Sequence, residues 1–137
     1  MANISYVFVD TVRFLRREIK RIKQKIMLEE MIVYQKAYDL LFWIKPAVER
    51  FARVHRYSLG VELEKEALEL LKSIARLNIK KDKKGAIEEC FVCLEIVKIL
   101  IRLSKDFKLI NIKQYEYSSE LIVEIEKMLF GLKKRFY

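Results

Sequence analysis

The sequence predicts an all-α protein: an up-down-up-down four-helix bundle with an extra basic N-terminal helix. The 137-residue chain contains only three glycines and one proline. Because turns usually need these residues, few and long elements are expected. Apolar residues recur at steps of three and four, the period of one helix face. Hydrophobic residues make up 53% of the chain, which is enough for a core without disulfides or metals.

The first predicted helix spans residues 5–28 and is strongly basic. Residues 1–27 carry seven basic and two acidic side chains, so this segment holds +5 of the total charge of +9. We therefore expect two parts: a basic amphipathic N-terminal helix at 1–30 and a four-helix bundle domain at 31–137. The apolar residues of the first part alternate in steps of four and three, as in a heptad seam; they are Phe8, Val12, Leu15, Ile19, Ile22 and Ile26.

The next two helices are expected at about 33–54 and from Ser58 to about residue 78. Ser58 is a candidate N-cap, because its hydroxyl can accept a free backbone N–H. The segment 55–60 is expected to be a connection. The inward residues of the first of these helices are Ala37, Leu40, Leu41, Ile44, Val48 and Phe51. Those of the second are Leu63, Ala67, Leu70, Leu71, Ile74 and Leu77.

The last two helices are expected at about 83–103 and from Asn111 onward. Asn111 and Gln114 have the spacing of a capping box. Short connections make successive helices antiparallel neighbours. The inward residues of the first are Ile87, Cys90, Phe91, Leu94, Val97 and Ile101. Those of the second are Ile112, Tyr115, Ile122, Ile125, Leu129 and Leu132.

The sequence offers no support for catalysis, a metal site or a cofactor. His55 is the only histidine, and a catalytic base would need a carboxylate to orient it. Cys90 and Cys93 have redox spacing but stand in an apolar helical run, so buried core thiols are expected. Zinc would need about four ligands, and no second cysteine pair exists. We expect a protein that binds partners and is not an enzyme.

No apolar stretch reaches the length of a membrane span, and the N-terminus lacks a secretory pattern. Two cysteines in one apolar run do not form a disulfide framework, so a reducing, cytoplasmic location is expected.

The basic clusters are the candidate binding site, for nucleic acid or for another anionic partner. Lysine and arginine would contact phosphates, and nearby aromatic rings could stack on unpaired bases. The alternative for each cluster is a solvated helix end, where cations are favoured. Charge reversal around Arg50, Arg53, Arg56 and residues 80–84 is expected to abolish binding. The candidate residues are Arg50, Arg53, Arg56, Lys80, Lys81, Lys83, Lys84, Arg102 and Lys105.

From about residue 27 to 134 the chain resembles the accessory variability determinant (Avd) proteins of diversity-generating retroelements. These belong to a wider superfamily of four-helix-bundle proteins that includes those encoded in intervening sequences of bacterial 23S ribosomal RNA genes. The resemblance rests on an ordered series of matches: 33–41 (VYQKAYDLL), Trp43, Pro46, Phe51, 56–60 (RYSLG), Leu70, Leu71, Ile74, Ala75, 103–106 (LSKD) and 113–116 (KQYE).

The resemblance implies a basic homopentameric barrel that binds the retroelement's reverse transcriptase and its structured template RNA. Such a protein supports mutagenic reverse transcription without performing chemistry. The alternative is a structural or interaction protein of the 23S ribosomal RNA intervening-sequence type, without a reverse transcriptase partner.

The chain departs from the family at Ala52, where a proline is frequent, and at His55, where an acidic residue is frequent. Both positions lie in the first connection. Family members usually begin near Met27 or Met31, so residues 1–26 could precede the native start. The regular seam favours a genuine helix that packs on the bundle or on a partner.

Overall fold

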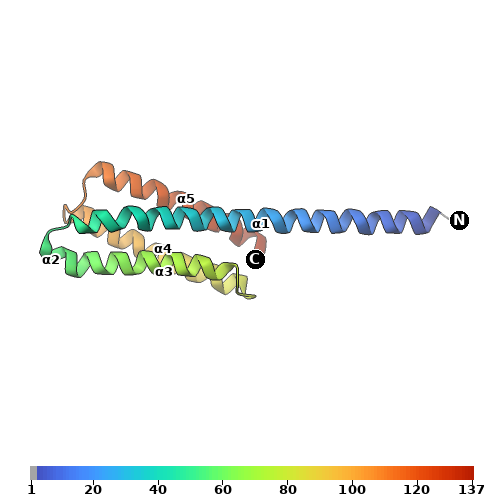
Figure 1. The fold of residues 1–137 in the computed structure, drawn as a ribbon, viewed down its shortest axis with the longest axis horizontal. Coiled ribbons are helices and arrows are strands. Elements are labelled where there is room, and N and C mark those ends of the chain that lie inside the picture. Colours follow the sequence, from blue (N-terminus) through green and yellow to red (C-terminus); the bar gives the residue numbers. More distant parts are fainter. Residues whose placement is uncertain (1–2) are drawn as a thin grey trace.

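Four long helices that pack against one another make up most of the protein. The computed structural model describes residues 3–137, with side-chain burial from residue 7 onward. Its elements are α1 (Asn3–Glu49), α2 (Arg53–His55), the π-helical turn η1 (Arg56–Gly60), α3 (Val61–Leu77), α4 (Lys83–Asp106) and α5 (Ile112–Phe136). No strand occurs between residues 3 and 137, so the predicted all-α class is confirmed. Each long helix runs opposite to the one before it (Figure 1).

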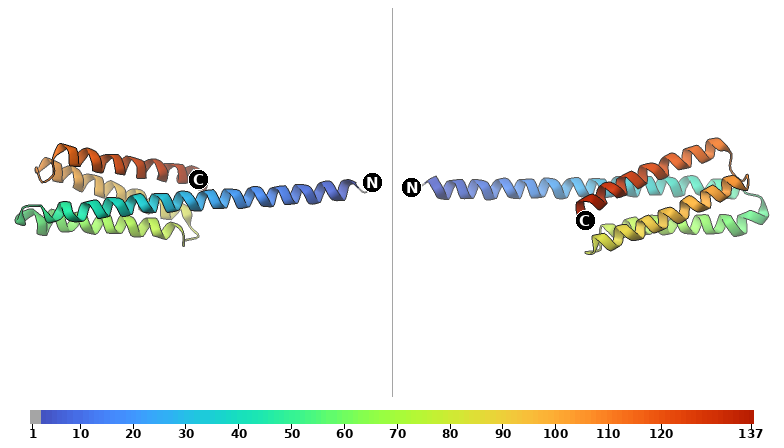
Figure 2. Two further views of the ribbon diagram at one scale, coloured as in Figure 1. Left: turned by 45° about the horizontal axis from the view of Figure 1, so that its top comes forward. Right: turned by 180° about the vertical axis from the view of Figure 1, so that it is seen from behind.

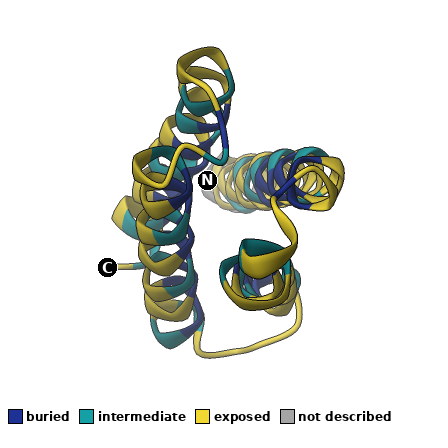
Figure 3. Cartoon of the chain, turned by 90° about the vertical axis from the view of Figure 1, so that its left-hand side faces the viewer, coloured by how far each residue is buried: buried dark blue, intermediate teal, exposed yellow. Residues whose placement is uncertain are grey.

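The core lies between α1, α3, α4 and α5. Figure 3 looks along the bundle from the end that carries α2, and the buried residues face the space between the helices. Most of the predicted inward residues are buried, while Leu41, Leu71, Phe91 and Tyr115 are half-buried. Ile112 was predicted to face inward, and this is wrong: it is the first residue of α5 and is exposed.

The predicted separation of helices 5–28 and 33–54 is also wrong, because one continuous helix, α1, covers both. Residues 29–32 contain no glycine or proline that would stop a helix. The helix ends at Glu49 and not near residue 54. The basic N-terminal segment is therefore the first half of α1.

This first half of α1 extends well beyond the other helices (Figures 1 and 2). Phe8, Leu15, Ile19 and Ile22 are exposed, although they belong to the predicted apolar seam. Ile26 packs partly against the core, which marks the point where the bundle begins.

The connection between α1 and α3 is mostly helical. The chain turns at residues 50–52 and continues through α2 and η1 directly into α3. The predicted N-cap role of Ser58 is wrong, since Gly60 precedes α3 in helical conformation and makes no side-chain cap. The Ser58 hydroxyl instead donates to the Val54 carbonyl at 3.0 Å.

The starts of α4 and α5 agree with the positions predicted from the sequence. Asn111 and Gln114 form the predicted capping box: the Asn111 side chain accepts from the Gln114 amide, and the Gln114 side chain accepts from the Asn111 amide, both at 2.8 Å. Asp82 caps α4, accepting the Gly85 amide at 3.0 Å. α4 continues three residues past its predicted end, to Asp106.

Two glycine-to-alanine changes are expected to act in opposite directions. Gly60 is buried, and an added Cβ would lie 2.6 Å from Val48 Cγ1, so Gly60→Ala is expected to cost roughly 1–3 kcal/mol by overpacking. Gly131 lies within α5 with nothing within 4 Å of an added Cβ. Gly131→Ala is therefore expected to stabilise the protein by about 0.5–1 kcal/mol. Urea unfolding of both variants checks this, and a stable Gly60→Ala protein would contradict the close packing of η1 on α1.

Candidate nucleic-acid and partner interface

Two connections meet at one end of the bundle and bring two of the predicted basic clusters together. The chain passes from α1 to α3 and from α4 to α5 at this end (Figure 1). The rings of His55 and Phe107 stack across the two connections, with centroids 5.6 Å apart. We call this surface the arginine end, and it consists of Arg50, Arg53, Arg56, Arg102, Lys105 and Lys108.

The cations of the arginine end differ in how firmly they are held. Arg50 and Arg53 are exposed, and no ion pair engages either of them within residues 7–137. Arg102 and Lys105 both lie near the Asp106 carboxylate, at 3.9 and 3.5 Å. Exposed pairs of this kind contribute little to stability, so these two side chains can exchange Asp106 for a phosphate.

Arg56 helps to hold the fold together, which the sequence did not indicate. It is half-buried in η1, and its guanidinium donates to the Phe51 carbonyl at 3.3 Å. Its Nε is buried and has no hydrogen-bond partner in the described part of the chain. Arg56 therefore holds the turn against the end of α1, and only part of its guanidinium is available to a ligand.

Lys108 has an unusual backbone conformation at the end of α4. Its φ is 60°, in the left-handed region that glycine normally occupies. The Leu109 amide donates to the Ser104 carbonyl at 2.8 Å, and the Lys108 amide donates to the Lys105 carbonyl at 2.9 Å. This is the hydrogen-bond pattern of a Schellman motif, which usually has glycine at this position. A lysine at this position therefore carries a conformational cost that glycine would not.

Replacing Lys108 with glycine is expected to raise stability. Relief of the left-handed strain, less the added freedom of the unfolded chain, gives a gain of roughly 0.5–1 kcal/mol. Urea unfolding measures this gain. Lys108→Ala is the control, because it removes the charge without relieving the strain; a gain in stability there would contradict this explanation.

The predicted cluster at residues 80–84 lies at the opposite end of the bundle, and several of its side chains interact with other residues of the protein. Lys80 pairs with Glu89 at 3.3 Å, and Lys84 lies 4.7 Å from the centre of the Tyr137 ring. Lys81 is exposed. We call this surface the lysine end, and it consists of Lys80, Lys81, Lys83, Lys84, Lys133, Lys134 and Arg135.

Lys83 links the lysine end to α1 through an ion pair. Its ammonium lies 3.6 Å from the carboxylate of Glu30, which is 5% exposed. Burial raises the pKa of Glu30, and the nearby Lys83 charge opposes that rise. Lys83 therefore compensates a buried carboxylate, and it is a poor candidate for contact with a partner.

The predicted site residues thus form two surfaces and not one. The 17 residues of α3 separate them, which corresponds to about 25 Å along a helix. Alternate connections of an antiparallel bundle lie at the same end, so the sequence already carried the signal that joins residues 50–60 with 102–108.

The arginine end has the features that suit RNA better. Tyr57 and Phe107 are 69% and 56% exposed there, within reach of unpaired bases. Arg50, Arg53 and Lys108, which lie in or beside the same two connections, are exposed as well. Among the described residues, three cations of the lysine end are paired with three different carboxylates, whereas Asp106 is the one carboxylate paired with cations of the arginine end.

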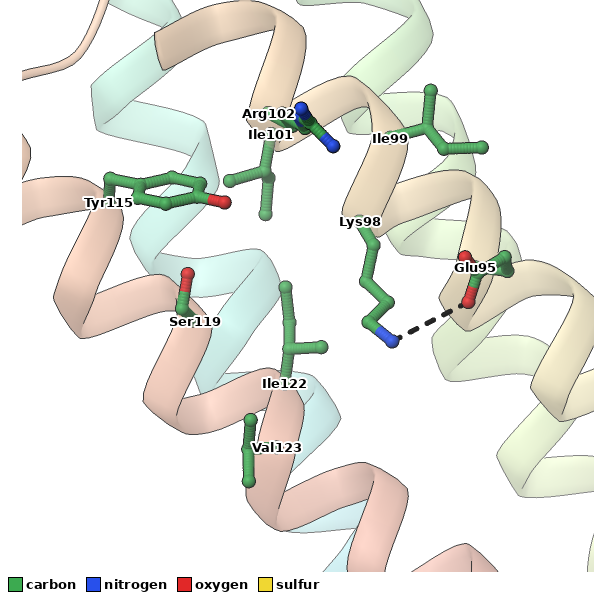
Figure 4. Close-up of a pocket in the computed structure, with 9 residues that line it drawn as sticks. All are labelled: Glu95, Lys98, Ile99, Ile101, Arg102, Tyr115, Ser119, Ile122 and Val123. Atoms are coloured by element: carbon green, nitrogen blue, oxygen red, sulfur yellow. Dashed lines mark hydrogen bonds and ion pairs between the residues drawn. The ribbon is translucent and has the colours of Figure 1, made fainter.

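A shallow hollow lies between α4 and α5, next to the arginine end (Figure 4). Lys98 lies in it and is held by the carboxylates of Glu95 and Glu126, at 3.5 and 3.1 Å. Most of the remaining lining is apolar, so the hollow suits an apolar side chain of a partner. Its lining residues are Glu95, Lys98, Ile99, Ile101, Arg102, Tyr115, Ser119, Ile122 and Val123.

The groups that could act as nucleophiles are ordinary core residues. Cys90 is fully buried, and burial raises the pKa of its thiol to about 11. Burial also raises the pKa of Cys93. Thiols with raised pKa values are poor nucleophiles at neutral pH. In the described part of the chain, no group of three or more His, Cys, Asp or Glu residues is placed to hold a metal ion.

None of the helices between residues 3 and 137 combines the length and apolar character that a membrane crossing requires.

Comparison with known protein families gives a match over most of the chain. A family model described as bAvd-like matches residues 31–136. None of the curated proteins compared with this chain matches it. The matched range contains the arginine end, the lysine end, α3, α4, α5 and residues 31–49 of α1, whereas the projecting half of α1 lies before it.

Proposed function

Because this chain belongs to the bAvd-like family, the Avd-like proteins of diversity-generating retroelements, we propose that it is a non-enzymatic accessory protein. In this role it binds a retroelement reverse transcriptase and its template RNA and supports mutagenic reverse transcription. The observation that carries the RNA part of the proposal is the arginine end, where exposed cations and exposed aromatic rings lie at two connections that meet at one end of the bundle.

RNA binding at the arginine end follows from charge and shape. Arg50, Arg53, Arg102 and Lys108 would contact phosphates, and such contacts depend on salt more than on sequence. Tyr57 and Phe107 would stack on unpaired bases of a structured template. We assign the lysine end, through Lys80, Lys81 and Lys84, to a separate contact with the partner protein, while Lys83 stays engaged with Glu30.

Self-association is supported by an exposed apolar stripe on α4. Its residues are spaced by four and three, so they lie on one helix face that points to solvent. Large exposed apolar patches mark interaction sites. We propose a homo-oligomer, a pentamer as in the Avd proteins, in which each arginine end is repeated and weak contacts add. The stripe consists of Val92, Ile96, Ile99 and Leu103.

Two further parts of the proposal concern organisation and location. We treat residues 1–30 and 31–137 as separate functional parts, although α1 joins them. We also place the protein in the cytoplasm, where its cysteines stay reduced.

Co-expression with the reverse transcriptase of the same retroelement tests the proposal. We expect the two proteins to purify together with template RNA, and we expect cDNA synthesis from that template to depend on this protein. If the protein neither binds the enzyme nor changes its product, the accessory role is wrong. The 23S ribosomal RNA intervening-sequence type of protein would then be the better description.

A further inference from the structure

The apolar seam of the projecting half of α1 is the direct continuation of the stripe that packs in the core. Eighteen residues make five full helical turns, so Phe8, Ile26 and Ile44 lie on one line along α1. Ile44 is fully buried, Ile26 is partly packed on the core, and Phe8 is 69% exposed. Within the bundle this stripe is covered by neighbouring helices; along the projection it is not.

Two ion pairs mark the point where the neighbouring helices stop covering the stripe of α1. Arg135, near the end of α5, pairs with Glu29 at 2.7 Å, and Lys83, at the start of α4, lies 3.6 Å from Glu30. Beyond them α1 continues alone toward the N-terminus (Figures 1 and 2). The projecting half of α1 therefore carries the same kind of apolar stripe that packs in the bundle. No other part of the described chain covers it there.

The shape of this surface selects a single helix as its ligand. The stripe faces the side of α1 on which α3, α4 and α5 lie, so the bundle would keep a flat lipid surface away from it. A seam built on alternating steps of three and four is narrow, which is typical of helix pairing and not of a helix lying in a membrane interface.

The charges beside the stripe select an acidic ligand. At 100° per residue, Arg16 and Lys23 flank the stripe on one side, and Lys25 and Glu18 flank it on the other. Glu18 is already paired with Arg21 at 2.8 Å. A second copy in antiparallel alignment would bring Arg16 next to Arg16 and add another +5, so it fits poorly. A helix with glutamates beside its own apolar seam complements both features.

We propose that residues 8–26 of α1 form a docking seam for an acidic amphipathic helix of another protein. The partner helix packs its apolar stripe on Phe8, Val12, Leu15, Ile19 and Ile22 and places carboxylates near Arg16, Lys23 and Lys25. This seam is separate from the arginine end, so its failure would leave the RNA-binding proposal unaffected.

A designed peptide tests the proposal with the full-length protein. The probe is a fluorescein-labelled peptide of about four heptads, with leucine at the seam positions and glutamate beside them. A scrambled peptide of the same composition is the first control. We expect the heptad peptide to bind at least about tenfold more tightly than the scrambled one.

Two variants with the same change in charge distinguish binding at the seam from non-specific electrostatic attraction between the basic protein and the acidic peptide. Ile19 lies on the seam and Gln24 on the opposite face, and both are exposed, so neither variant should affect folding. Ile19→Asp is expected to weaken peptide binding at least about tenfold. Gln24→Asp is expected to change it less than about twofold.

Each contrary outcome would overturn the proposal. Equal binding of the heptad and scrambled peptides, or equal effects of the two variants, would reduce the interaction to net charge. A lower oligomer mass of Ile19→Asp in light scattering would identify a second copy as the occupant. Tighter binding to phosphatidylcholine–phosphatidylglycerol vesicles than to the heptad peptide, lost in Ile19→Asp, would identify a lipid surface.

Discussion

Reversing two charges at the arginine end, as Arg50→Glu with Arg53→Glu, is expected to lower RNA affinity about 100-fold at moderate salt. Both side chains are exposed and are not held by carboxylates within residues 7–137. The change removes two phosphate contacts and places two negative charges beside the RNA backbone, and an oligomer would repeat it in every subunit. Fluorescence anisotropy with a structured RNA measures the effect.

The matched control is the same reversal at the lysine end, as Lys81→Glu with Lys134→Glu. These lysines are also exposed, and the change in net charge is identical. We expect a loss of affinity below about threefold, because a surface about 25 Å away is beyond the screening length at moderate salt. Circular dichroism and light scattering should show intact helices and oligomers for both variants. A control that weakens binding as much as the first variant would show that net charge, and not the arginine end, binds RNA.

Truncating Phe51 is expected to have the largest effect on stability. The side chain is 1% exposed and fills the corner where the chain leaves α1, next to Gly60 in η1. Phe51→Ala removes a whole ring from this corner, and the expected cost is about 3–5 kcal/mol. Urea unfolding followed by circular dichroism measures it.

Phe14→Ala makes the same chemical change at a position in the projecting half of α1 that is 56% exposed. Its expected effect on unfolding is within about 0.5 kcal/mol. A cost below about 1 kcal/mol for Phe51→Ala would mean that the end of the bundle is loosely packed. That result would also undermine the positioning of the arginine end, because Phe51 and Arg56 hold the same turn.

The helices of the bundle could be predicted from apolar periodicity, but the burial of Glu30 within α1 could not. The stripe of α1 passes through position 30, where the residue is a glutamate. A charged residue is normally expected at the surface and not on a buried line. In the structure this carboxylate is buried and paired with Lys83, which comes from another helix. The partner that makes the position acceptable is 53 residues away, beyond the reach of a local pattern.

The candidate site was more accessible. Each basic cluster could be located in the sequence, and the predicted up-down-up-down order of the helices already indicates which clusters share an end of the bundle. That order unites Arg53 with Lys105 and separates both from Lys81. The strained backbone of Lys108 could not be foreseen, because the sequence has no glycine there to mark the end of α4.

The most direct test of an RNA-binding accessory protein is the affinity of the purified protein for a structured RNA at two salt concentrations, with its mass measured in the same sample. We predict an oligomer whose affinity falls at least about tenfold between about 50 and 200 mM salt. A monomer that fails to bind RNA even at the lower salt concentration would contradict the account.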